Sequence, residues 1–92
     1  MKSVIYKYLV QTQREFALEI PDGRYEVLDV QMQQAAAVLW IRVSADPAAP
    51  KIKRWFWLLP TGMEFDDDHV TLKYVGTFQP TDKLTFHLFE TT

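Results

Sequence analysis

The sequence predicts an all-β fold of about seven mostly antiparallel strands, arranged as a small sandwich or a partly open barrel. Apolar and polar residues alternate with a period of two in most segments, as in strands with one buried face. Turn signals rich in Pro, Gly and Asp separate these segments, and helical spacing extends nowhere beyond about one turn. Because the 92 residues contain no repeat or long linker, we expect a single β domain over residues 1–92.

The first three strands are expected over residues 3–10, 15–20 and 26–33. A turn at residues 21–24 (PDGR) separates the second from the third, since Pro presets φ and Gly accepts a positive φ. The residues predicted to face inward are Val4, Tyr6, Tyr8, Val10, Phe16, Leu18, Ile20, Leu28, Val30 and Met32.

The two middle strands, over residues 36–44 and 52–59, carry large apolar groups on both faces. Such strands lie centrally in a sheet or beneath another element. The segment between them contains Pro47 and Pro50, which a central strand could not accommodate, and is therefore predicted to be a surface loop.

The C-terminal third contains a loop and two more strands. Residues 63–69 lack the alternation and are expected to form a loop or a single helical turn. In the next strand Val70, Leu72, Tyr74 and Phe78 are predicted to face inward, with Gly76 at a bulge or close backbone approach. After a turn at residues 80–82, the last strand is expected to direct Leu84, Phe86 and Leu88 inward.

Composition excludes several classes of protein. With 10 Lys and Arg against 12 Asp and Glu, the chain lacks the basic excess typical of domains that bind nucleic-acid phosphates, so we do not expect duplex nucleic acid as a partner. The absence of Cys removes disulfides, thiolate nucleophiles and Cys-based metal sites, and favours a reducing cytoplasm. No apolar run is long enough for a membrane span or a signal peptide, so we expect a soluble protein.

Several short motifs resemble a family of small uncharacterised proteins encoded by tailed phages and prophages. They are IYKY (5–8), IPDG (20–23), VLDVQ (27–31), LW (39–40) and, most specifically, LKYVGTFQ (72–79) followed by TFHLFE (85–90). The resemblance covers nearly the whole chain and implies a phage origin and expression inside a bacterium. It implies no reaction and no catalytic residue. The acidic segment at residues 60–70 departs from the family pattern.

Catalytic and metal sites find little support in the sequence. The acidic cluster Glu64, Asp66, Asp67 and Asp68 lacks the ligand spacing of a calcium loop, so solvated loop charges are the better interpretation. His69 and His87 are isolated and each has a structural explanation. No nucleophile elbow or phosphate-binding glycine loop is present. We therefore expect a protein that is not an enzyme, with no catalytic residues, metal or cofactor.

The strongest candidate surface combines aromatic and cationic residues of the two middle strands. If these strands pair antiparallel, they place an aromatic and a cationic stripe side by side, which could hold a partner or a nucleotide by stacking and charge. The alternative is that the tryptophans belong to the core or an interface and the cations discourage strand addition. The candidate residues are Trp40, Arg42, Lys53, Arg54, Trp55 and Trp57.

The sequence thus favours a non-enzymatic phage-encoded protein that acts by binding in the host cytoplasm. Its target would be a host or defence protein or a small nucleotide signal, as in a counter-defence or host-takeover factor. The alternative is a small structural component of the virion. Because an uncovered apolar outer face is rare in monomers, we also expect a homodimer or higher oligomer, with Trp55 or Trp57 in or beside the contact.

Overall fold

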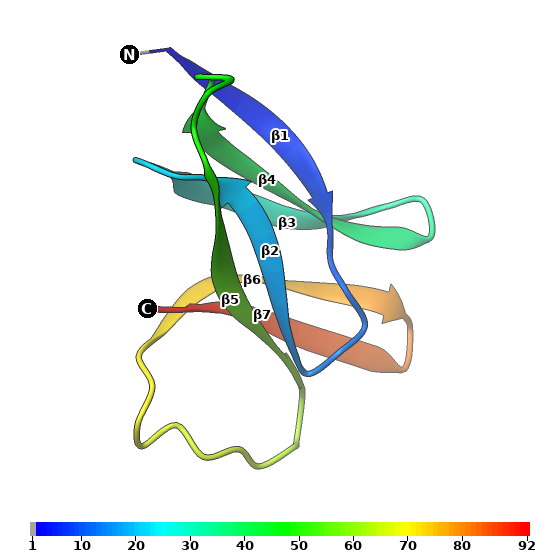
Figure 1. The fold of residues 1–92 in the computed structure, drawn as a ribbon. Helices are drawn as coiled ribbons and strands as arrows, with labels where there is room; N and C mark the ends of the chain where they lie inside the picture. The colour runs from blue at the N-terminus through cyan, green and yellow to red at the C-terminus, as the bar shows by residue number, and fades with distance from the viewer. Residues whose placement is uncertain (1) are drawn as a thin grey trace.

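The structure, a computed structural model, describes residues 2–92 and consists of seven strands in two antiparallel sheets (Figure 1). The strands are β1 (Ser3–Leu9), β2 (Glu15–Pro21), β3 (Glu26–Gln33), β4 (Ala36–Ser44), β5 (Lys51–Pro60), β6 (Leu72–Thr81) and β7 (Leu84–Thr91). The predicted all-β fold is confirmed, and the sheets do not close into a barrel. Among the described residues, no helix is long and apolar enough to cross a membrane.

The three-stranded sheet has the order β1-β4-β3 and the four-stranded sheet the order β2-β5-β7-β6. Both strands that the sequence marks as apolar on two faces, β4 and β5, are interior strands, as predicted. The loop with Pro47 and Pro50 carries the chain from one sheet to the other between them. β4 and β5 therefore belong to different sheets and do not pair.

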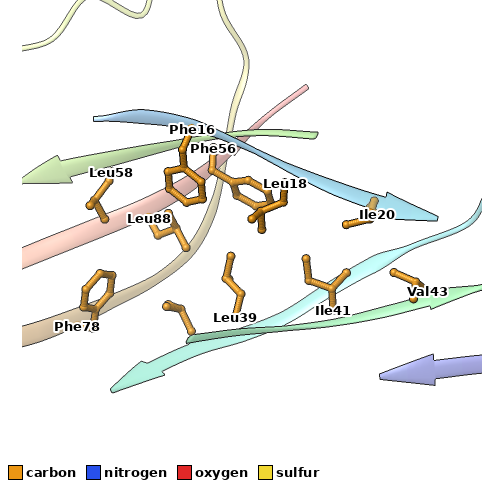
Figure 2. Packing of buried hydrophobic residues seen from close by; sticks show 11 residues of the cluster. Phe16, Leu18, Ile20, Leu39, Ile41, Val43, Phe56, Leu58, Phe78 and Leu88 are labelled. Carbon is orange, nitrogen blue, oxygen red and sulfur yellow. The ribbon is translucent and has the colours of Figure 1, made fainter. Parts of the chain in front are cut away.

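The core lies between the two sheets and is built from the inward-facing residues of both. Figure 2 shows Phe16, Leu18 and Ile20 of β2 pointing across the interior toward Leu39, Ile41 and Val43 of β4. At its centre Phe16 stacks on Phe56 with ring centroids 5.5 Å apart. Complete burial of such side chains contributes about 1.5–3 kcal/mol each, so this row is the main source of stability.

The edges of the two sheets come together where β3 lies beside β6. Gly76 of β6 sits so close to β3 that a Cβ atom there would lie 2.6 Å from Cγ1 of Val30. The β6–β7 register shifts between Tyr74 and Gly76. Both observations confirm the bulge and close approach predicted at this glycine.

Three residues predicted to face the core do not, because the strands that carry them are irregular. The extra residue in the β6 bulge reverses the alternation, so Tyr74 shares the outer face with Phe89 and Leu72 precedes it on that face. A second irregularity between Val27 and Asp29 leaves Leu28 exposed.

Two further predictions fail at the margins of the sheets. Tyr6 is on the core side of β1 but stays exposed because β1 is an edge strand. Leu84 is exposed because it adjoins the turn between β6 and β7. Bulges and edges are where a strict alternation ceases to predict burial.

Candidate functional site

A cavity opens at one end of the interior and is named the end pocket here. It has a volume of about 410 Å³. Its walls come from the β1–β2 segment, the β3–β4 turn and the adjoining ends of β5, β6 and β7. The lining residues are Val10, Gln11, Thr12, Gln13, Arg14, Met32, Ala35, Ala36, Ala37, Leu58, Pro60, Met63, Phe78, Pro80 and Phe86.

Local sequence explains why space remains at this end. The β3–β4 turn is tight, with Gln34 at a φ of 57°, and is followed by three alanines at residues 35–37. Methyl side chains cannot reach across the gap that the larger residues of β2 and β5 fill in the centre of the core. On the facing sheet β5 ends at Pro60, and the β6–β7 register shifts between Phe78 and Thr81, where Pro80 cannot donate a ladder hydrogen bond.

The mouth of the end pocket is polar on one side. Gln11 donates a hydrogen bond from Nε2 to the carbonyl oxygen of Ala17 over 3.3 Å, which ties the β1–β2 segment to β2. The guanidinium carbon of Arg14 lies 6.0 Å from the ring centroid of Trp57. Arg14 is the one charged residue among the described residues that line the pocket. The cavity is therefore an apolar chamber with a single cation at its rim.

At the opposite end of the interior three polar side chains lie together and are named the polar plug here: Tyr25, Arg54 and Glu90. The hydroxyl of Tyr25 donates a hydrogen bond to Oε2 of Glu90, whose side chain is only 2% exposed. The guanidinium carbon of Arg54 lies 4.7 Å from the centroid of the Tyr25 ring. Burial, followed by the hydrogen bond to Glu90, raises the pKa of Tyr25 to about 12.

The outer face of the four-stranded sheet carries an aromatic row that crosses three strands. Trp57 of β5, Phe89 of β7 and Tyr74 of β6 are register partners in that order. Phe65 from the β5–β6 loop packs edge-on against Trp57 with centroids 6.3 Å apart. Trp55 lies beyond this loop contact and is 44% exposed. Part of the predicted apolar face is thus covered from within the chain.

His87 lies on the same outer face and joins hydroxyls of neighbouring segments. Its Nε2 is 2.7 Å from Oγ1 of Thr61, and its Nδ1 is 3.0 Å from Oγ1 of Thr77. Tyr74 extends the chain by contacting Thr77 at 2.6 Å. An alcohol beside an imidazole is one part of a nucleophilic site, but the group orienting this imidazole is a neutral hydroxyl. The network connects β6, β7 and the start of the loop after β5.

The six candidate residues from the sequence do not form one surface. Trp40 and Arg42 lie on the outer face of the three-stranded sheet, where Arg42 forms an ion pair of 3.1 Å with Glu26. Lys53, Trp55 and Trp57 share the outer face of the four-stranded sheet. The expected side-by-side stripes are absent because the proline-containing loop sends β4 and β5 into different sheets.

Arg54 is the clearest departure from the expected cationic stripe. It is the register partner of Leu18, a core residue, and therefore points inward. Its Nε atom is buried and has no hydrogen-bond partner among the described residues. Its environment fits the polar plug and leaves it unable to contact a ligand on the outer face.

The acidic loop does not assemble a cation site in the described structure. Asp66 accepts a hydrogen bond from the backbone N–H of Asp68 over 2.9 Å, as in a local turn. His69 and Asp66 border a second hollow of about 300 Å³ beside Trp57. Over residues 2–92, no three His, Cys, Asp or Glu side chains gather closely enough to hold a metal ion.

Sequence reasoning missed both ends of the interior. The end pocket is lined by residues that the sequence assigned to the core, such as Met32, Phe78 and Phe86. An alternation of period two shows that a residue faces inward, but not whether the residues of the facing sheet are large enough to fill the space opposite it. A usable signal was present: the run of alanines at residues 35–37 stands beside a tight turn. The polar plug was signalled by Arg54 and Glu90, which fall on the same alternation as the apolar residues Phe56 and Leu88 of their strands.

Searches of curated proteins and of solved structures found no match to this chain. A family model described as a domain of unknown function, DUF7352, matches residues 1–92, the whole of the sequence. The chain therefore belongs to the DUF7352 family.

Proposed function

We propose that this protein is a non-enzymatic binding module that receives an apolar group of a small ligand in the end pocket. The observation that carries the proposal is the cavity of about 410 Å³ at one end of a core whose centre is closely packed. Binding pockets for small molecules have volumes of roughly 300–1,000 Å³ and mostly apolar walls with few polar groups. The end pocket fits this description in size and lining.

The lining also favours one ligand class over another. An apolar cavity of about 150 Å³ is enough for benzene, so the end pocket has room for a body of two fused rings or a short alkyl chain. A nucleotide would place several phosphate charges against apolar walls and Arg14 alone. An apolar or amphipathic ligand therefore fits better than the nucleotide signal that the sequence left open.

Two further features support binding over catalysis. Tyr25 and Glu90, titratable side chains that share a hydrogen bond, lie at the opposite end of the core and away from the cavity. His87 is hydrogen-bonded on both ring nitrogens to threonine hydroxyls on the outer face of the sheet. Neither group faces the chamber where a ligand would lie.

We place this activity in the cytoplasm of a phage-infected bacterium, as a counter-defence or host-takeover factor. The resemblance of residues 72–79 and 85–90 to phage and prophage proteins supports this setting. The ligand would then be of host origin or would be carried by a host protein. Recovery of the protein from purified virions would favour a structural role instead, whereas recovery from infected-cell lysate alone would favour the binding role.

The direct test uses indole, a neutral two-ring probe, and backbone amide shifts measured by NMR during titration. We expect saturable shifts confined to the end-pocket lining. Ala37→Leu extends a side chain into the pocket and should weaken binding at least about tenfold, a loss of about 1.4 kcal/mol. Ala48→Leu adds the same carbons to the exposed β4–β5 loop and should leave binding unchanged. Equal binding by both variants, or no saturable shift, would contradict the proposal.

A further inference from the structure

Four strands form the borders of the two sheets, and three of them are protected against further pairing. β3 and β6 lie beside each other, and each has a register irregularity. β2 presents Glu15 and Glu19 at alternate exposed positions and ends at Pro21. Bulges, prolines and charges are the usual devices by which proteins prevent edge-to-edge association.

β1 has almost none of these devices. Its seven residues pair with β4 without a register shift and include no Pro or Gly. Ile5 is 55% exposed, Tyr6 47% and Leu9 64%, so apolar surface follows the strand on both faces. Among the described residues, β4 is the only strand hydrogen-bonded to β1, and Figure 1 shows β1 at the border of its sheet.

The hydrogen-bonding groups on the free side of β1 can be assigned from its ends. The N–H of Val10 donates to the carbonyl oxygen of Ala37, and the carbonyl oxygen of Lys2 accepts from the N–H of Ala45, each over 3.0 Å. Consecutive residues of an antiparallel strand direct their N–H and C=O groups to opposite sides. The even-numbered residues of β1 therefore direct these groups toward β4. Ser3, Ile5, Lys7 and Leu9 therefore present their N–H and C=O groups at the free side.

We propose that β1 is a self-pairing edge, at which a second copy of this chain adds its own β1 antiparallel to form a continuous six-stranded sheet. In an antiparallel pair of two β1 strands, each residue whose N–H and C=O groups face the free side must lie opposite another such residue. The two-fold axis that relates the copies therefore passes through one residue of the strand and not between two residues. An axis at Tyr6 pairs all seven residues of β1, with Ile5 opposite the partner's Lys7 and Tyr6 opposite the partner's Tyr6. An axis at Lys7 would instead place like charges opposite each other, which is destabilising.

The charge pattern makes a second copy a better occupant than an arbitrary strand. Lys7 is the one charged residue within β1, and the Tyr6-centred register sets it against an apolar residue and not against another charge. On β2, an axis at Ala17 would set Glu15 against the partner's Glu19. Self-pairing is therefore favoured at β1 and opposed at β2. With only one strand from each copy in the contact, we expect a weak dimer with a dissociation constant in the range of about 1–100 µM.

The test compares opposite charges at the same position. Ile5→Lys places a lysine opposite the partner's Lys7 twice in the dimer, whereas Ile5→Glu places a carboxylate there. Both changes remove the same apolar side chain, so loss of hydrophobic contact affects them equally. Analytical ultracentrifugation from about 1 to 500 µM should show dimers for the parent protein and Ile5→Glu, and at least about tenfold weaker association for Ile5→Lys. Circular dichroism confirms that each variant is folded.

Two outcomes would overturn the proposal. One is a monomer of 10.8 kDa for the parent protein throughout this concentration range. The other is equal association by the two Ile5 variants together with dissociation by Trp55→Ala, which would place the contact on the outer face of the four-stranded sheet. Protection of the Ile5 and Lys7 amides from hydrogen exchange at high but not at low protein concentration would support pairing at β1 directly.

Discussion

The two ends of the interior are enclosed by the same two sheets but differ in what occupies them. At one end the polar plug brings Tyr25, Arg54 and Glu90 together between the sheets. At the other end the end pocket leaves a cavity beside Ala37 and Phe86. Between them lies the row of Figure 2, in which residues such as Phe56 and Leu39 are fully buried.

This difference separates a structural role from a binding role within one small core. Enclosing a carboxyl group and a guanidinium costs free energy unless they are hydrogen-bonded, so the plug requires its partners to stay in place. An apolar cavity costs lost packing contacts, which a ligand would restore on binding. Each end therefore predicts a different response to substitution.

The largest expected effect is the loss of stability when a core phenylalanine is truncated, and it should differ between the centre of the core and the end pocket. Phe56 is fully buried in the centre, and Phe56→Ala should lower the free energy of unfolding by about 3–5 kcal/mol. Phe86 is half-buried, packs against Phe78 with centroids 5.9 Å apart and borders the cavity, so Phe86→Ala should cost only about 2 kcal/mol. Urea unfolding monitored by tryptophan fluorescence measures both. Equal losses would mean that the pocket end is packed as closely as the centre.

The next effect concerns the polar plug. Glu90→Ala leaves the Tyr25 hydroxyl without its acceptor inside the protein and should cost about 1–3 kcal/mol. Glu90→Gln preserves the shape and one acceptor oxygen and should cost less. Urea unfolding measures the free energy of unfolding of both variants and so ranks their losses. If both variants match the parent protein, the hydrogen bond to Tyr25 makes no net contribution and the closed end is not held by it.

The pH dependence of stability provides a second test of the hydrogen bond between Tyr25 and Glu90. The pKa of Tyr25 is raised to about 12 in the folded protein from 10.0, first by burial and then by Glu90. Above pH 10 the unfolded chain therefore loses this proton while the folded protein retains it, and stability falls as the pH rises toward 12.

Tyr25→Phe isolates this contribution from other groups that titrate in the same range. It should be less stable by about 1 kcal/mol at neutral pH, through loss of one hydrogen bond. Above pH 10 its stability should fall less steeply than that of the parent protein. Melting temperatures at a series of pH values provide both comparisons, and parallel curves for the two proteins would contradict the assignment.

The sequence predicted much of the fold and little of the site, for reasons that particular residues illustrate. Alternation of period two identifies strands and inward residues such as Phe16 and Leu88, because burial of one face depends only on local spacing. Pairing between strands depends on how loops direct the chain, so the placement of Trp40 and Trp57 on separate sheets could not be obtained from spacing. Cavity volume depends on residues from several strands at once, which no local pattern encodes.

The smallest expected effect is a gain in stability at the end pocket. Ala37 lies on β4 opposite Met32 and lines the cavity, so Ala37→Leu can place additional carbons in existing space. Filling a cavity typically stabilises a protein by about 0.5–2 kcal/mol. Because part of the new side chain will face the mouth, we expect the lower end of that range, a rise in melting temperature of about 2–4 °C for a domain of this size.

The matched control is Ala48→Leu, which adds the same side chain to an exposed loop position and should leave the melting temperature within about 1 °C of the parent value. A fall in melting temperature for Ala37→Leu alone would indicate overpacking, and hence that the walls beside Ala37 are already in contact. A rise combined with loss of indole binding would connect the two properties of this end of the molecule. The cavity would then lower stability in the free protein and provide the volume that a ligand occupies.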